Sequence, residues 1–277
     1  MENSKLKQGV PLFFLVILSL LFTAPVVIVL INSFKGQFYI SDALFALPVG
    51  EMFAGIANYI SGIEKTKFFD AAFYSLFITV FSVLLIAVLT AMTSWYLVRT
   101  KGKVSNIIYY SFVFSMIVPF QMVMFTLSKV ANLLKFDNPI GIIFVYLGFG
   151  AGLSVFIYSG FIRSIPIELE EAATVDGCGP IKMFFLVVFP VLRPTAITIA
   201  ILNTMWIWND YLLPYLTIGN EYKTIPIAVQ YLQGGYGSRD MGALMAMLVL
   251  AIIPVIIFYI LCQKYIIKGV AAGAVKG

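Results

Sequence analysis

The stretch AAFYSLFITVFSVLLIAVLTAMTSWYLV, from Ala71 to Val98, contains no Asp, Glu, Lys or Arg. A helix needs about 20 apolar residues to cross the hydrocarbon core of a bilayer, and this stretch is longer than that. Backbone groups in lipid must be hydrogen-bonded within the protein, which favours helices. The stretch lacks the alternating polarity of a transmembrane β-strand. It therefore predicts a transmembrane helix.

The composition of the whole chain agrees with this prediction. The chain is 61% hydrophobic and 11% charged, whereas soluble domains carry roughly 25% charged residues. The net charge of +5 could suggest nucleic acid, but the positive residues lie between apolar stretches and form no basic face, which excludes nucleic-acid binding. There is no histidine, and Cys178 and Cys262 lie far apart. These features exclude a disulfide framework and give no metal-ligand spacing.

Five further apolar stretches bring the predicted number of transmembrane helices to six. The fifth is interrupted by Asp210 and resumes at Tyr211. The first could be mistaken for a signal peptide, but it is too long and lacks a cleavage site, so we expect a retained helix. We predict an all-α integral membrane protein with one domain over 1–277 and spans at about 11–33, 71–98, 105–128, 139–162, 195–218 and 241–263.

The Lys and Arg residues outside these spans predict the orientation. One set of segments is richer in them, and its clearest member is the short loop from Arg99 to Lys103. Because cytoplasmic loops carry the excess of Lys and Arg, this set is expected to be cytoplasmic. We therefore expect a multi-pass protein of the cell membrane with both termini in the cytoplasm. The segment from Arg163 to Arg193 should then be cytoplasmic, and the segment from Asn32 to Asp70 external.

Residues 164–190 are unusually polar for a chain of this kind. Glu168, Glu170 and Glu171 follow Pro166, so they should lie early in a helix, where the helix dipole favours negative charge. Gly177 and Gly179 should end that helix, and Pro180 can begin a second one. An ordinary polar loop is the alternative. A loop of the usual length, about 2–8 residues, would not need to contain two helices. The two expected helices in residues 164–190 therefore favour a docking element.

The spacing within this segment resembles a known family signature. Glu171-Ala172-Ala173, then Gly177, then Val187-x-Phe189-Pro190 is similar to the EAA motif of binding-protein-dependent ABC importer permeases, with two apolar substitutions near its end. Further segments resemble the carbohydrate subgroup, and in particular the smaller permease of maltose-type oligosaccharide importers. They are Asn58-Tyr59, Val118 to Gln121, Phe161 to Pro166 and Trp208 to Pro214.

The resemblance implies a type I ABC importer fold with a cytoplasmic coupling helix that docks on an ATPase. The residues it assigns to coupling are Glu171, Ala172, Ala173, Asp176, Gly177 and Pro190. Glu171 would pair with the ATPase, the alanines would allow close packing, and Gly177 would make the bend. The implied partners are a second permease forming a heterodimer, a cytosolic ATPase dimer and an extracellular solute-binding protein.

The chain itself contains no phosphate-binding loop. Gly102-Lys103 lacks the upstream glycine and is followed by Val104. ATP and magnesium are therefore expected on the partner ATPase, and no cofactor or catalytic residue is expected in this chain.

Polar and aromatic residues of the third and fifth spans are candidates for the substrate pathway. An acidic residue within a span suggests a pathway or a pairing, and aromatic rings beside polar groups suit sugars. The candidates are Asn209, Asp210, Trp206, Tyr211 and Gln121. The alternatives are an aromatic interface belt with a polar helix end and, for Gln121, an interhelical hydrogen bond.

The sequence thus predicts a permease subunit of a sugar importer, for which an oligosaccharide is the expected substrate. An importer of a non-sugar solute, such as a glycerol phosphate ester, is an alternative. An ion-coupled carrier would usually show intramembrane carboxylates or histidines, and this chain has almost none. An intramembrane enzyme would need a nucleophile–base pair or metal ligands.

Overall fold

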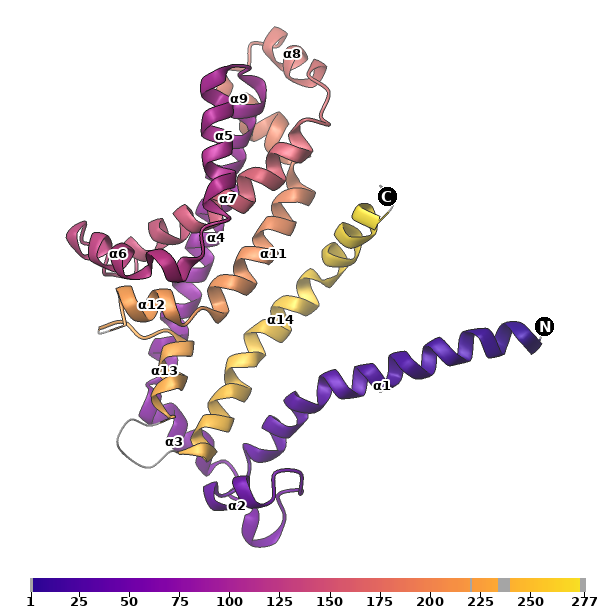
Figure 1. The fold of residues 1–277 in the computed structure, drawn as a ribbon, viewed down its shortest axis with the longest axis vertical. Helices are drawn as coiled ribbons and strands as arrows, with labels where there is room; N and C mark the ends of the chain where they lie inside the picture. The colour runs from indigo at the N-terminus through magenta and orange to yellow at the C-terminus, as the bar shows by residue number, and fades with distance from the viewer. Residues whose placement is uncertain (1, 220, 234–239, 275–277) are drawn as a thin grey trace. The chain divides into compact units, whose positions relative to one another are not determined.

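The computed structural model describes residues 2–219, 221–233 and 240–274, with side chains described for 11–219, 221–233 and 240–265. The described residues form helices and connecting turns, and the one β-contact among them is an isolated bridge between Lys35 and Phe53 (Figure 1). The helices are α1 Glu2–Asn32, α2 Gln37–Asp42, η1 Gly50–Met52, α3 Ala57–Thr66, α4 Phe68–Arg99, α5 Lys103–Ser115, α6 Phe120–Leu133, α7 Gly141–Ile162, α8 Glu168–Val175, α9 Pro180–Met183, η2 Phe184–Val188, α10 Phe189–Val191, α11 Arg193–Asn209, α12 Leu212–Thr217, α13 Ile225–Tyr231 and α14 Met241–Ala274. The predicted all-α membrane fold is confirmed.

Four described helices are continuous and apolar enough to span a membrane, at Pro11–Asn32, Phe68–Arg99, Gly141–Ile162 and Met241–Tyr265. Two bent pairs also qualify, Lys103–Ser115 with Phe120–Leu133 and Pro180–Val191 with Arg193–Asn209. If each pair counts as one span, the described part of the chain has six.

The third predicted span is not one straight helix. The chain turns by 105° between α5 and α6. Pro119 has φ −62° and ψ 134° there, and a proline also disfavours the helical conformation in the residue before it. The fifth predicted span likewise stops early, because α11 ends at Asn209 and Asp210 is extended with ψ 123°.

The chain divides into two compact units, of which the first comprises Met1–Phe69 and Ala228–Pro254. Its polar groups order the connection between α1 and α3. The buried Lys35 ammonium donates to Asn32 Oδ1 at 3.0 Å and to the carbonyl oxygens of Ala43 and Leu44 at 2.6 and 3.3 Å. Asn58 Nδ2 donates to the carbonyl oxygens of Ser33 and Lys35. The backbone of this connection is thus held by side chains rather than by a sheet.

In the same unit, Asp240 precedes α14 and caps it. Asp240 Oδ1 accepts a hydrogen bond from the amide of Ala243, and Oδ2 forms an ion pair with Lys65 of α3. Burial raises the pKa of the Asp240 carboxyl, but the hydrogen bonds from Lys65 and Ala243 outweigh it and hold that pKa below its usual value. The carboxylate therefore joins the end of α3 to the start of α14.

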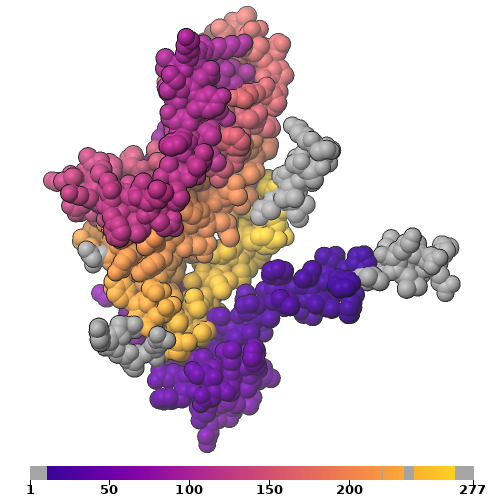
Figure 2. Space-filling model, in the orientation of Figure 1, coloured from indigo at the N-terminus to yellow at the C-terminus, as the bar shows by residue number. Residues whose placement is uncertain are grey.

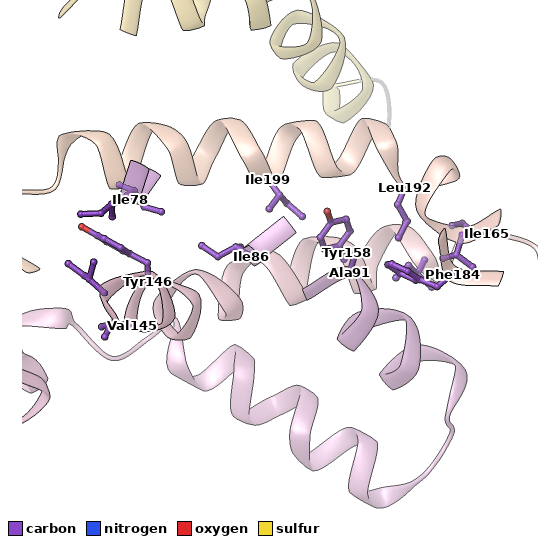
Figure 3. Packing of buried hydrophobic residues seen from close by; sticks show 14 of the residues in the cluster. Ile78, Ile86, Ala91, Val145, Tyr146, Tyr158, Ile165, Phe184, Leu192 and Ile199 are labelled. Carbon is purple, nitrogen blue, oxygen red and sulfur yellow. The ribbon is translucent and has the colours of Figure 1, made fainter. Parts of the chain in front are cut away.

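The second unit comprises Asp70–Ile227 and Val255–Gly277, and its core lies among α4, α7 and α11. Figure 3 shows the buried side chains as a continuous row, from Tyr146 and Val145 at one end to Ile165, Leu192 and Phe184 at the other. Tyr158 of α7 donates from its hydroxyl to the carbonyl of Ala87 in α4, at 3.0 Å. Polar contacts of this kind fix the helices where apolar packing alone would let them slide.

Side chains of α4 and α11 lie close to Gly150 of α7. A Cβ atom at this position would lie 2.6 Å from Ile86 Cδ1 and 2.8 Å from Asn203 Oδ1. Asn203 is buried and its amide donates to Ser154 Oγ at 3.3 Å. A side chain at position 150 would therefore have to displace the side chains of Ile86 and Asn203.

The outer helices of this unit carry apolar side chains on their surface. α5 packs along α7, and α6 packs against α12 (Figure 1). Figure 2 shows the surface over α5 and α6. The exposed side chains of these two helices include Ile107, Tyr110, Phe114, Met122 and Phe125. Exposed aromatic and aliphatic groups of this density suit lipid or another membrane subunit.

Candidate functional site

Residues 164–190 fold as two short helical stretches around a turn, as the sequence predicts. α8 begins at Glu168, two residues after Pro166, and its first turn contains Glu168, Glu170 and Glu171. Negative charge there is favoured by the exposed amides of a helix start. No side chain caps the start of α8, and the Ser164 hydroxyl donates to the carbonyl of Phe161.

Gly177 ends α8 in the left-handed conformation, with φ +76°. The amide of Cys178 donates to the carbonyl of Ala173, and the amide of Gly177 donates to that of Thr174, each at 3.0 Å. This pair of bonds is the Schellman motif, in which the residue after the helix adopts a positive φ that glycine tolerates best. No atom lies within 4 Å of the Cβ position at Gly177. The glycine is therefore required by backbone conformation and not by space.

The two sides of α8 differ in exposure. Glu170 and Ala173, three residues apart and so on one face, are buried, whereas Glu171 and Ala172 are exposed. Ala173 belongs to the apolar core of its own unit. The sequence interpretation assigned both alanines to close packing with a partner. In the structure only Ala172 is accessible to one.

Glu170, which the sequence interpretation did not select, makes the most contacts of the three glutamates. Its Oε2 accepts from Trp95 Nε1 at 2.9 Å, and its Oε1 lies 2.8 and 2.7 Å from Nε and Nη2 of Arg99. Arg99 Nη2 also donates to the carbonyl of Ile165, at 3.1 Å. Trp95 and Arg99 lie one turn apart in α4, so that helix ends against the start of α8.

The second half of the segment leads into the fifth span. Pro180 begins α9, as predicted, whereas Gly179, which was expected to end the first helix, is the N-cap of α9. The short π-helix η2 follows from Phe184 to Val188. Phe184 is fully buried and its ring lies 5.8 Å from that of Trp95. The last residue of the predicted signature, Pro190, is exposed in α10, and Asp176 is the exposed C-cap of α8.

Asp210 is the C-cap of α11, and its carboxylate binds the first amides of α12. Its Oδ1 accepts from the amides of Leu212 and Leu213 at 3.0 and 3.4 Å, and its Oδ2 accepts from the Tyr146 hydroxyl at 3.1 Å. Tyr146 is fully buried in α7. The carboxylate thus directs a turn and joins α7 to it.

The structure places the other pathway candidates around this turn or at the start of α6. Asn209 is exposed and its amide donates to the carbonyl of Met205, while Trp206 lies edge-on to Tyr146 with ring centroids 5.5 Å apart. Tyr211 stacks on Tyr215 at 5.1 Å. Gln121 is exposed in the first turn of α6. Asn203, buried in mid-span, was not selected from the sequence, although it is polar within an apolar stretch.

Comparison with known proteins relates this geometry to a family. Residues 84–272 match the family described as "Binding-protein-dependent transport system inner membrane component", and this range includes α8, Gly177 and the α11–α12 turn. The chain belongs to this family. It is therefore a membrane-embedded permease component of an ABC importer and not an enzyme.

Several relatives match most of the length of the chain. The "Probable starch degradation products transport system permease protein AmyC" of Thermoanaerobacterium thermosulfurigenes is 41% identical over 262 residues, which cover 94% of each chain. The "Multiple sugar-binding transport system permease protein MsmG" of Streptococcus mutans is 30% identical over 93% of each chain. The "Melibiose/raffinose/stachyose import permease protein MelC" of Bacillus subtilis is 32% identical over 79% of this chain and 80% of its own.

A solved structure has the same fold. It is described as "Crystal structure of a bacterial ABC transporter involved in the import of the acidic polysaccharide alginate". The matching chain aligns with a TM-score of 0.78 at 23% identity, over 96% of this chain and 98% of its own. The bent helix pairs described above thus belong to a fold with a solved counterpart.

Proposed function

We propose that this permease imports an oligosaccharide. The observation that carries the proposal is the 41% identity, over 94% of both chains, to a permease named for starch degradation products. Relatives named for multiple sugars and for melibiose, raffinose and stachyose support the same class of solute.

The exposed side of α8 is the proposed contact with a cytosolic ATPase. It offers the Glu171 carboxylate, the small Ala172 side chain and the apolar side chain of Val175, which is 88% exposed. An exposed apolar residue beside a carboxylate suits an interface that buries one and pairs the other. Asp176 and Pro190 are exposed nearby in the sequence, and Gly177 fixes the end of the docking helix.

The complete importer would also contain a second permease and an extracellular solute-binding protein. The family description calls the transport system binding-protein-dependent, which supports a binding protein as a partner. The distribution of Lys and Arg supports an orientation with both termini in the cytoplasm, which places α8 on the ATPase side. ATP and magnesium would bind to the partner ATPase.

The α11–α12 turn is the proposed contribution of this chain to the sugar pathway. The exposed amide of Asn209 and the partly exposed ring of Trp206 could present hydrogen-bonding and stacking groups to a sugar. Asp210 and Tyr146 would hold this turn, while Tyr211 and Gln121 are further candidates. Substitution of Asn209 by Ala should then lower sugar uptake without changing assembly.

The test is ATPase stimulation of the purified four-component importer. The permease is assembled with its second permease, ATPase and binding protein in proteoliposomes, and hydrolysis is followed with maltotetraose, raffinose and glycerol 3-phosphate. Stimulation by an oligosaccharide is expected. Stimulation by glycerol 3-phosphate alone would favour a non-sugar solute and contradict the proposal.

A further inference from the structure

Two adjacent glutamates in α8 face opposite environments. Glu171 is exposed, whereas Glu170 is 8% exposed and its carboxylate is occupied by side chains of α4. The EAA motif begins at Glu171 and does not include Glu170. The motif therefore does not explain the buried carboxylate of Glu170.

Both carboxylate oxygens of Glu170 accept hydrogen bonds, each from a different side chain. Arg99 approaches Oε1 through Nε and Nη2, and the Trp95 indole donates to Oε2. Such charge-assisted bonds fix geometry more strongly than neutral ones, and the planar guanidinium holds several acceptors in a defined arrangement. Arg99 uses Nη2 a second time to bind the carbonyl of Ile165, in the turn before α8. One arginine therefore fixes both the helix and the turn that leads into it.

The contact between Glu170 and Arg99 joins α8 and α4, which are not consecutive in the sequence. α8 follows α7 in the sequence and packs against η2 and α9. Arg99, the last residue of α4, precedes Glu170 by 71 residues in the sequence. Trp95 also contacts Phe184 of η2, so α4 reaches both halves of the segment through neighbouring side chains. A displacement of α8 can thus reach α4, a membrane-spanning helix, through Glu170 without passing along α7.

We propose that Glu170, held by Arg99 and Trp95, is a positioning residue that makes α8 and the end of α4 move as one body when the ATPase moves α8. The inference rests on the proposed docking of an ATPase at α8. It assigns the two glutamates different tasks, because Glu171 would face the partner and Glu170 would transfer the resulting displacement within this chain.

The direct test is a distance across this contact in the working complex. Spin labels are attached at Leu169→Cys in α8 and Tyr96→Cys in α4, both exposed positions outside the proposed docking surface, in a Cys178→Ser, Cys262→Ser background. The distance distribution is measured in the complete importer, without nucleotide and after trapping with ATP and vanadate. We expect the same distribution in both states for the intact contact, and a distribution that differs between states in Glu170→Gln.

The functional readout is sugar transported per ATP hydrolysed. In Glu170→Gln this ratio should fall several-fold while the ATPase still co-purifies, because docking is kept and transfer is lost. The matched variant Glu171→Gln should instead lower co-purification of the ATPase. Arg99→Lys should give an intermediate ratio, since it keeps the charge and loses the planar arrangement.

Two results would overturn the inference. One is a Leu169–Tyr96 distance that changes between states while Glu170 is intact. The other is a Glu170→Gln importer with the ratio of the unmodified protein. Failure of the ATPase to co-purify with the unmodified permease would contradict the proposed docking itself, and is recognised before any distance is measured.

Discussion

The carboxylates of Glu170 and Asp210 lie near the two ends of one apolar cluster, and different groups bind them. Glu170 joins α8 to α4 through the Arg99 guanidinium and the Trp95 indole. Asp210 accepts from neutral groups, the Tyr146 hydroxyl and the backbone amides of Leu212 and Leu213. Figure 3 shows Tyr146 and Phe184, the ring next to Trp95, at opposite ends of the row.

The difference indicates different tasks. A charge pair between segments distant in sequence resists their separation, and breaking one partner leaves an uncompensated charge. A carboxylate that caps the turn following it sets a local backbone direction, as an N-cap does. The α8 end is thus built to keep two helices together, and the α11–α12 end to shape a turn.

The largest effect is expected from removing the cation at the α8 end. Arg99→Ala leaves Glu170 with the indole alone and should lower the free energy of unfolding by about 3 kcal/mol, the lower end of the cost of breaking a buried pair, since some solvent reaches both side chains. Unfolding of the purified permease in detergent with added SDS measures this. A double-mutant cycle with Glu170→Gln should show coupling between the two positions, and additive effects would contradict the pairing.

A smaller effect is expected at the other end. Asp210→Ala removes the cap of α12 and leaves the buried Tyr146 hydroxyl without this acceptor, which together should cost about 2 kcal/mol. Asp210→Asn keeps an oxygen for the amides and should be much closer to the unmodified protein. The same unfolding measurement compares them, and a loss in Asp210→Asn equal to that in Asp210→Ala would show that charge, rather than the turn, matters here.

Replacing Gly177, which ends α8, by a β-branched residue should lower the free energy of unfolding by about 1–2 kcal/mol. Gly177→Val places a side chain at φ +76°, whereas Gly177→Asn introduces a residue that tolerates this region better. Because no atom crowds the Cβ position, the difference between the two variants isolates backbone strain. Equal stability and equal ATPase association for both variants would contradict the assigned role.

The smallest effect is expected at a more exposed carboxylate with a similar set of partners. Asp240 pairs with Lys65 and caps α14, but the Lys65 side chain is 54% exposed. Asp240→Asn keeps the cap and should cost less than about 1 kcal/mol, as exposed pairs do. Because the Asp240 pKa is lowered in the folded protein, its contribution is present above the unfolded-state pKa and is lost as pH falls through the folded-state value. Unfolding of Asp240→Asn should therefore show a weaker loss of stability on acidification than the unmodified protein.

Hydropathy was sufficient to predict the membrane class, because long uncharged stretches leave few other structures possible. Local chemistry was sufficient for Gly177, since a glycine after a short polar helix has few other uses. The bend at Pro119 was not predicted, because proline is also tolerated inside transmembrane helices and hydropathy does not distinguish the two cases.

The pairing of Glu170 could not be read from the sequence. Its position three residues before Ala173 places both on one face of α8, but nothing local indicates which helix that face meets. The partner lies 71 residues earlier, at the end of a span where an arginine is expected for topology alone. Asp210 was found as an acidic residue in an apolar stretch, but whether it faced a pathway or a turn depended on Tyr146 of another helix.

The central claim, that the exposed side of α8 receives the ATPase, is tested most directly by site-specific cross-linking in the assembled importer. A cysteine at Ala172 is compared with one at Phe45, an exposed residue of the segment predicted to be external, both in the Cys178→Ser, Cys262→Ser background. A short thiol–amine cross-linker should join residue 172 to the ATPase subunit and should not join residue 45 to it. An ATPase adduct from residue 45 and none from residue 172 would contradict both the docking surface and the orientation of the chain.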